Sequence, residues 1–236
     1  MTEIIDNQEQ RLVLRVRDYL EAGASSARLA VGYLFLDGLV PLRAQIGRLE
    51  CLEILIGNVV NRLTEEQVRE EAALRQRGGE EWVRPQEDVA ATLRDTHDRA
   101  TAETVLTLRE TLAALDRTPE IQALLLCLAE CIAGGSLKVR LYTHGRIHAK
   151  VALIGYPAGH ADAPGVAVVG SSNLTLGGAA HPTELNIALS DAGSFLEMER
   201  WYRGLWNVSQ DFHRELFTEL GQSWALGGVA NGSLDH

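Results

Sequence analysis

The fold is decided by RIHAKVALI at residues 146–154 and, one loop later, by VAVVGSSN at residues 166–173. Apolar and β-branched residues fill most of both segments, which is typical of buried β-strands. Side chains alternate across a strand, so Arg146, His148 and Lys150 are expected to project from one face of the first strand. The second strand is expected to end in a turn of small residues that carries hydroxyl and amide groups.

Four further strands are predicted around this pair, from short apolar runs bounded by turn residues. They lie at residues 28–35, 52–56, 137–142 and 185–189. A short helix is expected within residues 39–49, and a strand, a helix and a strand in succession imply a parallel pair with a right-handed crossover. The sequence therefore predicts an α/β fold with a mixed, mainly parallel central sheet flanked by helices.

Residues 62–134 change to helical periodicity, and we predict that they form a helical insertion in this fold. The insertion opens with a capping-box pattern at residues 64–67. Its last helix has Thr118 as the expected N-cap and Pro119 at the first helical position, and two glycines at residues 134–135 end it. Residues 137–189 that follow are then the part of the sheet that bears the motifs.

A long C-terminal helix is predicted at residues 194–221. It starts with a capping box from Ser194 to Glu197, and its apolar stripe is expected to run from Trp201 to Leu220. Core packing is the expected role of tryptophans on such a stripe. Residues 1–226 are read as one domain, and the glycine-rich, polar residues 227–236 as a flexible tail.

Composition and charge exclude several kinds of protein. The chain has 236 residues and a formal net charge of −10, which argues against indiscriminate wrapping around nucleic acid but leaves room for local basic patches. Its longest apolar stretch, residues 121–133, is shorter than the roughly 20 residues that span a bilayer. The acidic N-terminus lacks the features of a secretory signal, so we predict a cytoplasmic protein without a membrane segment.

Three cysteines, Cys51, Cys127 and Cys131, do not make an even set for disulfides, and Cys127 and Cys131 fall within an apolar helical pattern where buried thiols are common. Neither a metal site nor a cofactor is predicted from them.

Five residues near the motifs have side chains that suit attack on a phosphodiester: His148, Lys150, Ser171, Asn173 and Glu184. A neutral imidazole can attack phosphorus, and a second imidazolium can protonate the leaving oxygen. Lysine, serine and asparagine can hold the nonbridging oxygens as charge builds up. A glutamate on the other ring nitrogen would fix the tautomer and orientation of the imidazole. This chemistry needs no metal.

Each part of this set has an ordinary structural explanation when it is taken alone. A His-x-Lys triplet is often a strand surface, Gly-Ser-Ser-Asn is often only a turn, and Glu184 alone would be a solvated strand end. Arg146 either reaches a phosphate or forms a salt bridge with a nearby carboxylate. The order of the three parts, each beside a predicted strand, is what makes the combination informative.

The region resembles the phospholipase D superfamily, whose motif reads His-x-Lys, four residues, Asp, six or more residues, then Gly-Ser-x-Asn. The matching residues are His148, Lys150, Gly170, Ser171 and Asn173. The resemblance also implies a glutamate about ten residues past the asparagine, a position filled by Glu184. Gly155 stands where the motif has aspartate, which is largely structural in the family, so the resemblance implies a change in local support.

A wider likeness covers most of the chain. Residues 32–35, residues 52–58, the helical insertion and residues 171–175 resemble the phospholipase D-like domain at the N-terminus of some SNF2-type bacterial helicases. Two motifs meet at one active site in the superfamily, whereas this chain has a single His-x-Lys. The resemblance therefore implies a homodimer with His148 of both chains at one site. His144 or His181 as a second base within one chain is the alternative, although packing or solvent exposure is the plainer role for each.

Two functions follow from these observations. The first is a metal-independent phosphodiesterase, a nuclease that acts on DNA in preference to RNA through a phosphohistidine on His148, associated with a helicase region in the same polypeptide. The second is a nucleic-acid-binding module of a helicase that keeps Lys150, Ser171 and Asn173 without turnover. Phospholipid hydrolysis is disfavoured, because no basic amphipathic helix suited to a membrane surface is found in the sequence.

Overall fold

The computed structural model describes residues 2–6, 12–57, 86–145, 147–160, 163–172 and 184–227, with the side chains of the long helix described from residue 97. Its strands are β1 (Thr2–Ile5), β2 (Ser26–Val31), β3 (Cys51–Gly57), β4 (Leu137–Tyr142), β5 (Lys150–Gly155), β6 (Gly165–Gly170), β7 (Asn186–Leu189) and β8 (Gln210–Asp211). Its helices are α1 (Leu12–Glu21), the 3₁₀ helix η1 (Asp37–Leu42), α2 (Arg43–Ile46), α4 (Gln86–Ala114), α5 (Pro119–Ala133), α6 (Ala192–Asn207) and α7 (His213–Gln222).

The strands form one eight-stranded sheet in the order β1-β7-β6-β5-β2-β3-β4-β8. The α/β class and the mixed sheet are confirmed, but the prediction that the sheet is mainly parallel is wrong. Among the described strands, only the pairs β2–β3 and β3–β4 are parallel, and the other five neighbouring pairs are antiparallel. The crossover through η1 and α2 makes β2 and β3 parallel as expected. On the other side of β2, the neighbours β5, β6 and β7 pair in antiparallel fashion, and β2 itself is antiparallel to β5.

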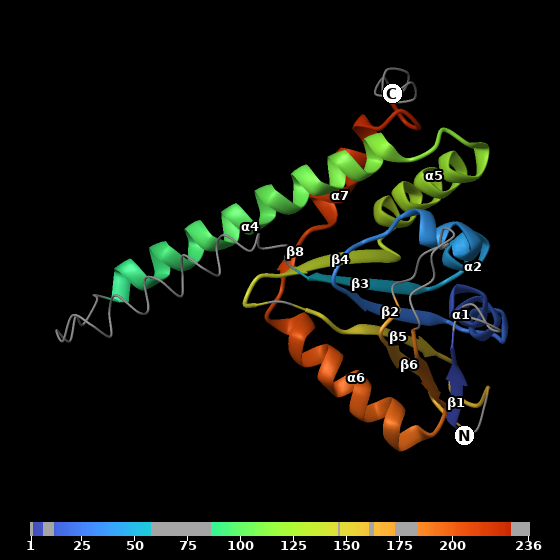
Figure 1. Cartoon of the computed structure of the whole chain (residues 1–236). Coiled ribbons are helices and arrows are strands. Elements are labelled where there is room, and N and C mark those ends of the chain that lie inside the picture. Colours follow the sequence, from blue (N-terminus) through green and yellow to red (C-terminus); the bar gives the residue numbers. More distant parts are fainter. Residues whose placement is uncertain are drawn as a thin grey trace.

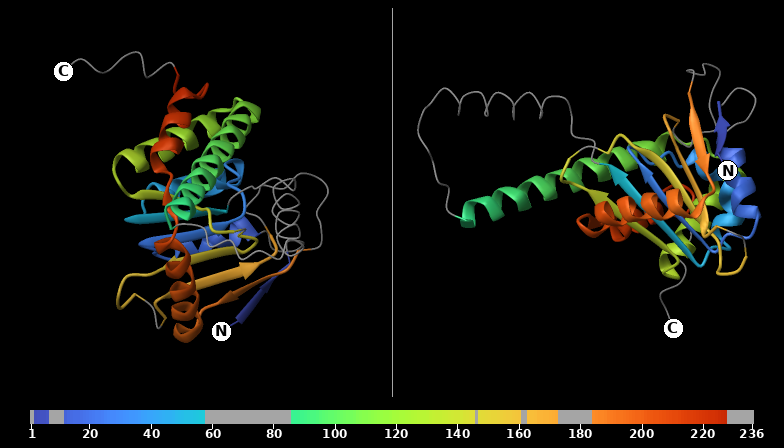
Figure 2. Two further views of the ribbon diagram at one scale, coloured as in Figure 1. Left: turned by 90° about the vertical axis from the view of Figure 1, so that its left-hand side faces the viewer. Right: turned by 90° about the horizontal axis from the view of Figure 1, so that it is seen from below.

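Helices cover the two faces of the sheet unequally (Figures 1 and 2). On one face α1, η1, α2, α5 and α7 enclose the larger hydrophobic core. On the other face α6 packs on the sheet through Phe195, Tyr202 and Trp206. Alternation along the strands supplies both cores, since Ile154 of β5 belongs to the first and Leu153 to the second. Helix α4 packs on α7 near its own C-terminus and extends away from the sheet at its other end (Figure 1).

The C-terminal helix predicted at residues 194–221 is two helices. Residues 210–211 form β8 and pair with β4, so α6 ends at Asn207 and α7 begins at His213. The predicted N-cap is also displaced, because the Asp191 side chain accepts a hydrogen bond from the Ser194 amide at 2.8 Å. Trp201, placed on the predicted apolar stripe, is exposed, and α6 buries Phe195, Tyr202 and Trp206 instead.

The third predicted helix has the expected ends. Thr118 caps α5 by accepting a hydrogen bond from the Ile121 amide at 3.3 Å, and Pro119 is the first helical residue. The capping-box pattern at residues 64–67 lies outside the described residues, as does most of the predicted tail. In the described part of the chain, no helix has the length and apolar character needed to cross a membrane.

Candidate active site

Strand register brings the three separate parts of the predicted site to one edge of the sheet. In the antiparallel ladders Lys150 of β5 lies opposite Gly170 of β6, and Gly170 lies opposite Asn186 of β7. Residues directly opposite each other in such ladders are about 5 Å apart at their Cα atoms. The start of β5, the turn after β6 and the segment before β7 are therefore neighbours in space, although up to 36 residues separate them in the chain.

His148 is held by a chain crossing that the sequence did not predict. The expected strand at residues 146–154 begins only at Lys150, so His148 lies in the segment before it, and Arg146 falls outside the described residues. Ile147 is buried where this segment passes the ends of β2 and β3. A Cβ atom at Gly57 would lie 3.1 Å from both the Cβ and the carbonyl oxygen of Ile147, so glycine permits the close approach.

This crossing leaves the imidazole of His148 exposed at the edge of the sheet, next to Lys150. The ammonium group of Lys150 donates a hydrogen bond to the backbone carbonyl of His148 at 3.3 Å. Lys150 is half-buried and lines a small cavity together with α1 and the end of β2. The cavity volume is about 10 Å³, room for about one water molecule. A phosphate group would therefore have to bind at the surface of the edge rather than inside it.

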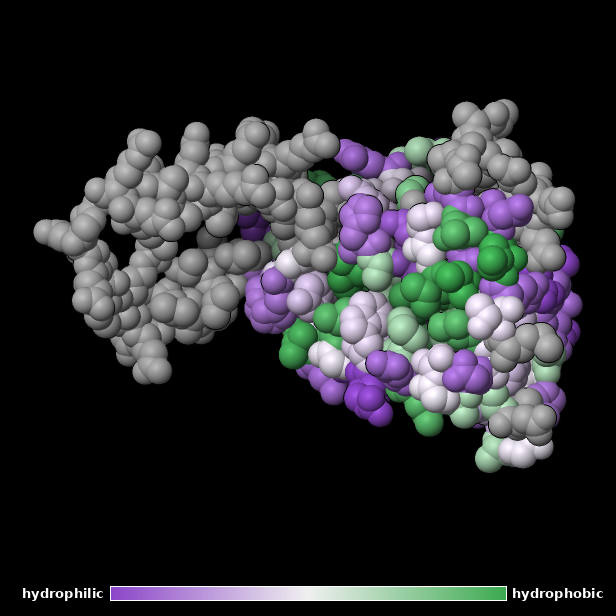
Figure 3. Space-filling view, turned by 60° about the horizontal axis from the view of Figure 1, so that its bottom comes forward, coloured by the Kyte–Doolittle hydropathy of each residue, from purple (hydrophilic) through white to green (hydrophobic). Residues whose placement is uncertain are grey.

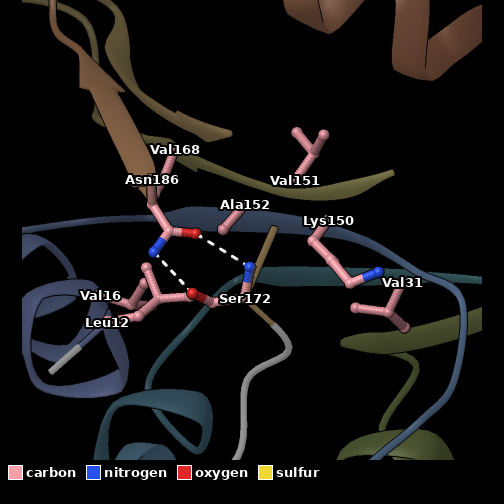
Figure 4. Close-up of a pocket in the computed structure, with 9 residues that line it drawn as sticks. All are labelled: Leu12, Val16, Val31, Lys150, Val151, Ala152, Val168, Ser172 and Asn186. Carbon is pink, nitrogen blue, oxygen red and sulfur yellow. Dashed lines mark hydrogen bonds between the residues drawn. The ribbon is translucent and has the colours of Figure 1, made fainter. Parts of the chain in front are cut away.

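The turn after β6 is fixed by a buried amide. The Asn186 side chain donates to the Ser172 hydroxyl at 2.7 Å and to the Ile5 carbonyl at 3.2 Å, and its oxygen accepts from the Ser172 amide at 3.2 Å. Figure 4 shows the Asn186 amide facing Ser172, with both of their hydrogen bonds. Asn186 and Ser172 are each only 1% exposed. Buried polar groups paired in this way set a single conformation for the turn.

The position of Asn186 also explains why the first residue of the Gly-Ser-Ser-Asn segment, Gly170, is a glycine. A Cβ atom at Gly170 would collide with the Asn186 side chain and with the Leu185 carbonyl oxygen. A larger residue would force β6 and β7 apart at the place where the site is built. Glycine at this position is therefore a packing requirement of β7.

Ser171 joins the turn to the segment that carries Glu184. The Ser171 hydroxyl accepts a hydrogen bond from the Leu185 amide at 3.2 Å, and the Ser171 amide donates to the Leu185 carbonyl at 3.2 Å. Ser171 is exposed and Glu184 is half-buried, one residue before this pair of bonds. The structure thus brings together His148, Lys150, Ser171 and the backbone of Glu184, whereas Asn173 lies outside the described residues.

His144 and His181 are the alternatives for a second base, and the structure describes His144. His181 lies outside the described residues. The Nε2 atom of His144 is 3.0 Å from the Val208 carbonyl, to which it must donate, and its ring meets the ring of His97 edge to face at 5.4 Å between centroids. These contacts support a packing role for His144.

Gly155, at the position of the motif aspartate, lies at the other end of β5. Five residues separate it from Lys150, roughly 17 Å along an extended strand. It pairs with Ser26 of β2, and a Cβ atom at residue 155 would collide with the Ser26 hydroxyl. The departure from the motif therefore changes packing between β5 and β2, far from His148.

Sequence reasoning missed the roles of Ser172, Asn186 and Ile147. A polar residue at an inward position of a strand, as Asn186 is next to the buried Ala188, is the signal that could have identified it. The crossing at Ile147 left no such signal. In the described part of the chain, no three histidine, cysteine or acidic side chains gather closely enough to hold a metal ion.

No family model matches the sequence, and no curated protein matches it. Solved structures with a similar outline include Nuc from Salmonella typhimurium, a phospholipase D family member, with 12% identity over 89% of this chain and 97% of that protein and a TM-score of 0.49. NucT from Helicobacter pylori has 14% identity over 90% of this chain and 99% of its own, with a TM-score of 0.45. Polyphosphate kinase from Porphyromonas gingivalis has 15% identity over 88% of this chain but 26% of its own, with a TM-score of 0.48. At these values the function has to be inferred from the residues of this chain.

Proposed function

We propose that this protein is a metal-independent phosphodiesterase, a nuclease that cleaves DNA through a phosphohistidine on His148. The observation that carries the proposal is the register that sets Lys150, Gly170 and Asn186 in one row across β5, β6 and β7. It gathers a nucleophile, a cation and hydroxyl donors at one exposed edge, which is the set that attack on a phosphodiester requires.

The chemistry follows from the roles of these groups. A neutral imidazole nitrogen of His148 attacks phosphorus, the bond from phosphorus to the leaving oxygen breaks, and an imidazolium supplies the proton to that oxygen. Water then attacks the phosphohistidine, and the free imidazole returns. Lys150 and Ser171 hold the nonbridging oxygens with Asn173 and Arg146, and Glu184 orients the imidazole.

The proton donor in this scheme is His148 of a second copy, so the active form is a homodimer with two-fold symmetry. An exposed apolar surface next to the site supports this arrangement. Ile4 of β1 lies opposite Ile187 of β7, and the exposed fractions of Ile4, Ile187 and Leu185 are 65%, 38% and 54%. Alternation along the strands places them on the face of the sheet that carries α6, because Ile5 and Ala188 belong to the core on the opposite face. Figure 3 shows hydrophobic side chains gathered on this side of the molecule. Apolar patches of this kind mark association surfaces.

We further propose that the protein works in the cytoplasm beside a helicase region of the same polypeptide. The second candidate function is a nucleic-acid-binding module of that helicase without turnover. The small volume of the cavity at Lys150, about 10 Å³, favours a surface that holds a phosphate over one that encloses it, and such a surface suits either function.

The test is cleavage of end-labelled single- and double-stranded DNA by the purified protein in excess chelator. Cleavage is expected, and His148→Ala should abolish it, while His213→Ala, which removes another exposed histidine, should cleave like the wild type. Denaturation in alkaline detergent during turnover should trap label on the wild-type protein alone, because the phosphorus–nitrogen bond of a phosphohistidine survives alkali but breaks in acid.

The outcomes separate the two functions. Chelator-treated protein that leaves both DNAs intact, with His148→Ala behaving identically, contradicts the nuclease. DNA binding that survives His148→Ala but is lost in Lys150→Ala then identifies the binding module. Dimer formation is tested by sedimentation of the wild type and of Ile187→Glu, which should shift the protein to monomer and stop cleavage together.

A further inference from the structure

A second cavity lies at the same edge of the sheet, on the face that α1 and α4 share. Its volume is about 130 Å³. Its walls include Tyr33 and Phe35 from the segment after β2, Ile56 from β3, and Thr104, Thr107 and Thr111 from α4. Cavities of about 150 Å³ with apolar walls bind benzene in other proteins, so this one has the size of a single aromatic ring.

The cavity is adjacent to the candidate active site. Val31 lines the small cavity at Lys150, and Ile56 lines the ring-sized one. Val31 and Ile56 are opposite each other in the parallel ladder of β2 and β3, so the two cavities lie on neighbouring strands. A strand of nucleic acid with a phosphate at His148 and Lys150 would therefore have an adjacent nucleotide within reach of the cavity.

The walls of the cavity suit stacking more than hydrogen bonding. Tyr33 and Phe35 are 48% and 37% exposed, although aromatic side chains at a folded surface usually turn their faces to a partner. Their ring centroids are 6.1 Å apart with planes 43° from parallel. The three threonine hydroxyls donate to carbonyls of α4 one turn earlier, at 2.8, 3.1 and 2.8 Å, and this leaves no free hydroxyl donor among them.

We infer that this cavity takes one unpaired nucleobase next to the phosphate that His148 attacks, so that the substrate is single-stranded nucleic acid. The inference rests on the proposed function, because it needs the strand to pass His148. A paired base is stacked between its neighbours and has to leave the helix before it can enter such a cavity. Stacking on aromatic rings is tolerant of base identity, so the cavity selects strandedness and not sequence.

The experiment measures binding of a short labelled DNA, single-stranded or annealed to its complement, by fluorescence anisotropy in chelator. All proteins carry His148→Ala, so that the DNA stays intact and binding is measured without cleavage. The double variant Tyr33→Ala/Phe35→Ala is expected to bind the single strand about five- to a hundred-fold more weakly, the effect of losing a stacking platform. Phe217→Ala removes a similarly exposed phenylalanine from α7 and should bind like the parent.

A second variant and a modified DNA test whether the loss of binding comes from the cavity itself. Thr107→Leu retains both aromatic rings but fills the cavity, so it should also weaken single-strand binding. In a series of DNAs that each lack the base at one position, a single position should weaken binding by the parent protein. The Tyr33→Ala/Phe35→Ala protein should bind that DNA as tightly as it binds the intact strand. Equal losses on duplex and single strand, or an unchanged affinity in both variants, overturn the inference.

The results distinguish a failure of the proposed base site from a failure of the proposed nuclease. Loss of single-strand binding in the cavity variants, with no DNA cleaved by the protein that retains His148, keeps the base site and removes the nuclease. Cleavage that depends on His148 but shows no difference between cavity variants and control keeps the nuclease and removes the base site.

Discussion

Two buried polar clusters strengthen the sheet, and they differ in charge and in position. At the edge that carries the site, Asn186, Ser172 and the Ile5 carbonyl form a neutral network. Beneath α6, the Glu53 carboxylate of β3 accepts from Arg28 of β2 at 3.1 Å and from Arg203 of α6 at 2.9 Å. The first fixes a turn, and the second ties a helix to the sheet.

The difference in charge suits the neutral cluster to holding the turn at the candidate site. A neutral network can position a turn without attracting counter-ions or competing with a phosphate for Lys150. The charged cluster is much more costly to disturb, because Glu53 is 7% exposed and the Arg28 side chain 14%, and a buried ion without its partner is poorly solvated. The tyrosine next to it is affected too, since burial and then the Glu53 charge raise the pKa of Tyr202.

The largest expected effect is on stability and comes from the charged cluster. Glu53→Ala leaves Arg28 buried without its main partner and should lower the free energy of unfolding by about 3–5 kcal/mol. Urea unfolding followed by circular dichroism measures it. Glu199→Ala is the matched control, because this carboxylate also bonds Arg28 but is 27% exposed, and it should cost about 1 kcal/mol or less. Equal losses in the two variants would contradict a special role for the buried carboxylate.

The neutral cluster should show a smaller loss of stability and a larger loss of function. Asn186→Ala removes the hydrogen bonds to the Ser172 amide and the Ile5 carbonyl, at about 0.5–1.5 kcal/mol for each bond, so the total loss should be about 1–3 kcal/mol. The freed turn displaces Ser171, and misplacement by about 1 Å can cost roughly a hundredfold in turnover. Cleavage rates and urea midpoints are compared with those of Ser172→Ala, which keeps the Asn186 bond to Ile5. A stability loss without any change in rate would separate the cluster from the site.

Sequence patterns predicted where most of the strands lie in the chain, but not which strands are neighbours in the sheet. β4 occupies residues 137–142 as predicted, and β3 extends one residue beyond each of its predicted ends, because short apolar runs with turn residues have few other solutions. The position of β5 between β6 and β2 depends on contacts over more than a hundred residues, which local periodicity does not record.

For the candidate site, the sequence names residues but does not show how they are held in place. His148, Lys150 and Ser171 lie together as their motif order suggested, but alternation along a strand did not place His148, because the chain leaves strand geometry where Ile147 crosses Gly57. Close approaches between distant segments are invisible in a single sequence. The N-cap of α6 shows the same limit, since both Asp191 and Ser194 can cap and only tertiary packing decides between them.

A third test asks whether the far end of β5 belongs to the site. Gly155→Asp restores the motif residue but sets its Cβ against the Ser26 hydroxyl, so it should destabilise the protein by about 1–3 kcal/mol, as overpacking does. Adding Ser26→Gly should recover most of this loss, with Ser26→Gly alone as the control. Cleavage per folded molecule should stay the same throughout, and a gain of activity in the double variant would place residue 155 in the machinery after all.

The smallest effect comes from a charged pair outside both clusters. Arg109 of α4 donates two hydrogen bonds to Glu219 of α7, at 2.9 and 2.7 Å, and these bonds lower the pKa of Glu219 below its ordinary value of 4.5. A lowered pKa in the folded state contributes stability above pH 4.5, and that contribution is lost as the pH falls through the folded value. Arg109→Gln should therefore melt at a slightly lower temperature than the wild type at pH 7, with the difference shrinking below pH 4.5.

Only the difference between the two proteins isolates this pair. Hydrogen bonds from Arg15 and Tyr19 also lower the pKa of Glu3, so the whole molecule loses stability in acid with the same sign. Arg109 is 57% exposed, and solvent screens its attraction for Glu219 in a way that it does not for Arg28 and Glu53. The Glu219 side chain itself is only 6% exposed, so the two pairs differ in the exposure of the arginine. If Arg109→Gln cost as much as Glu53→Ala at pH 7, exposure of the arginine would not be what separates this pair from the charged cluster beneath α6.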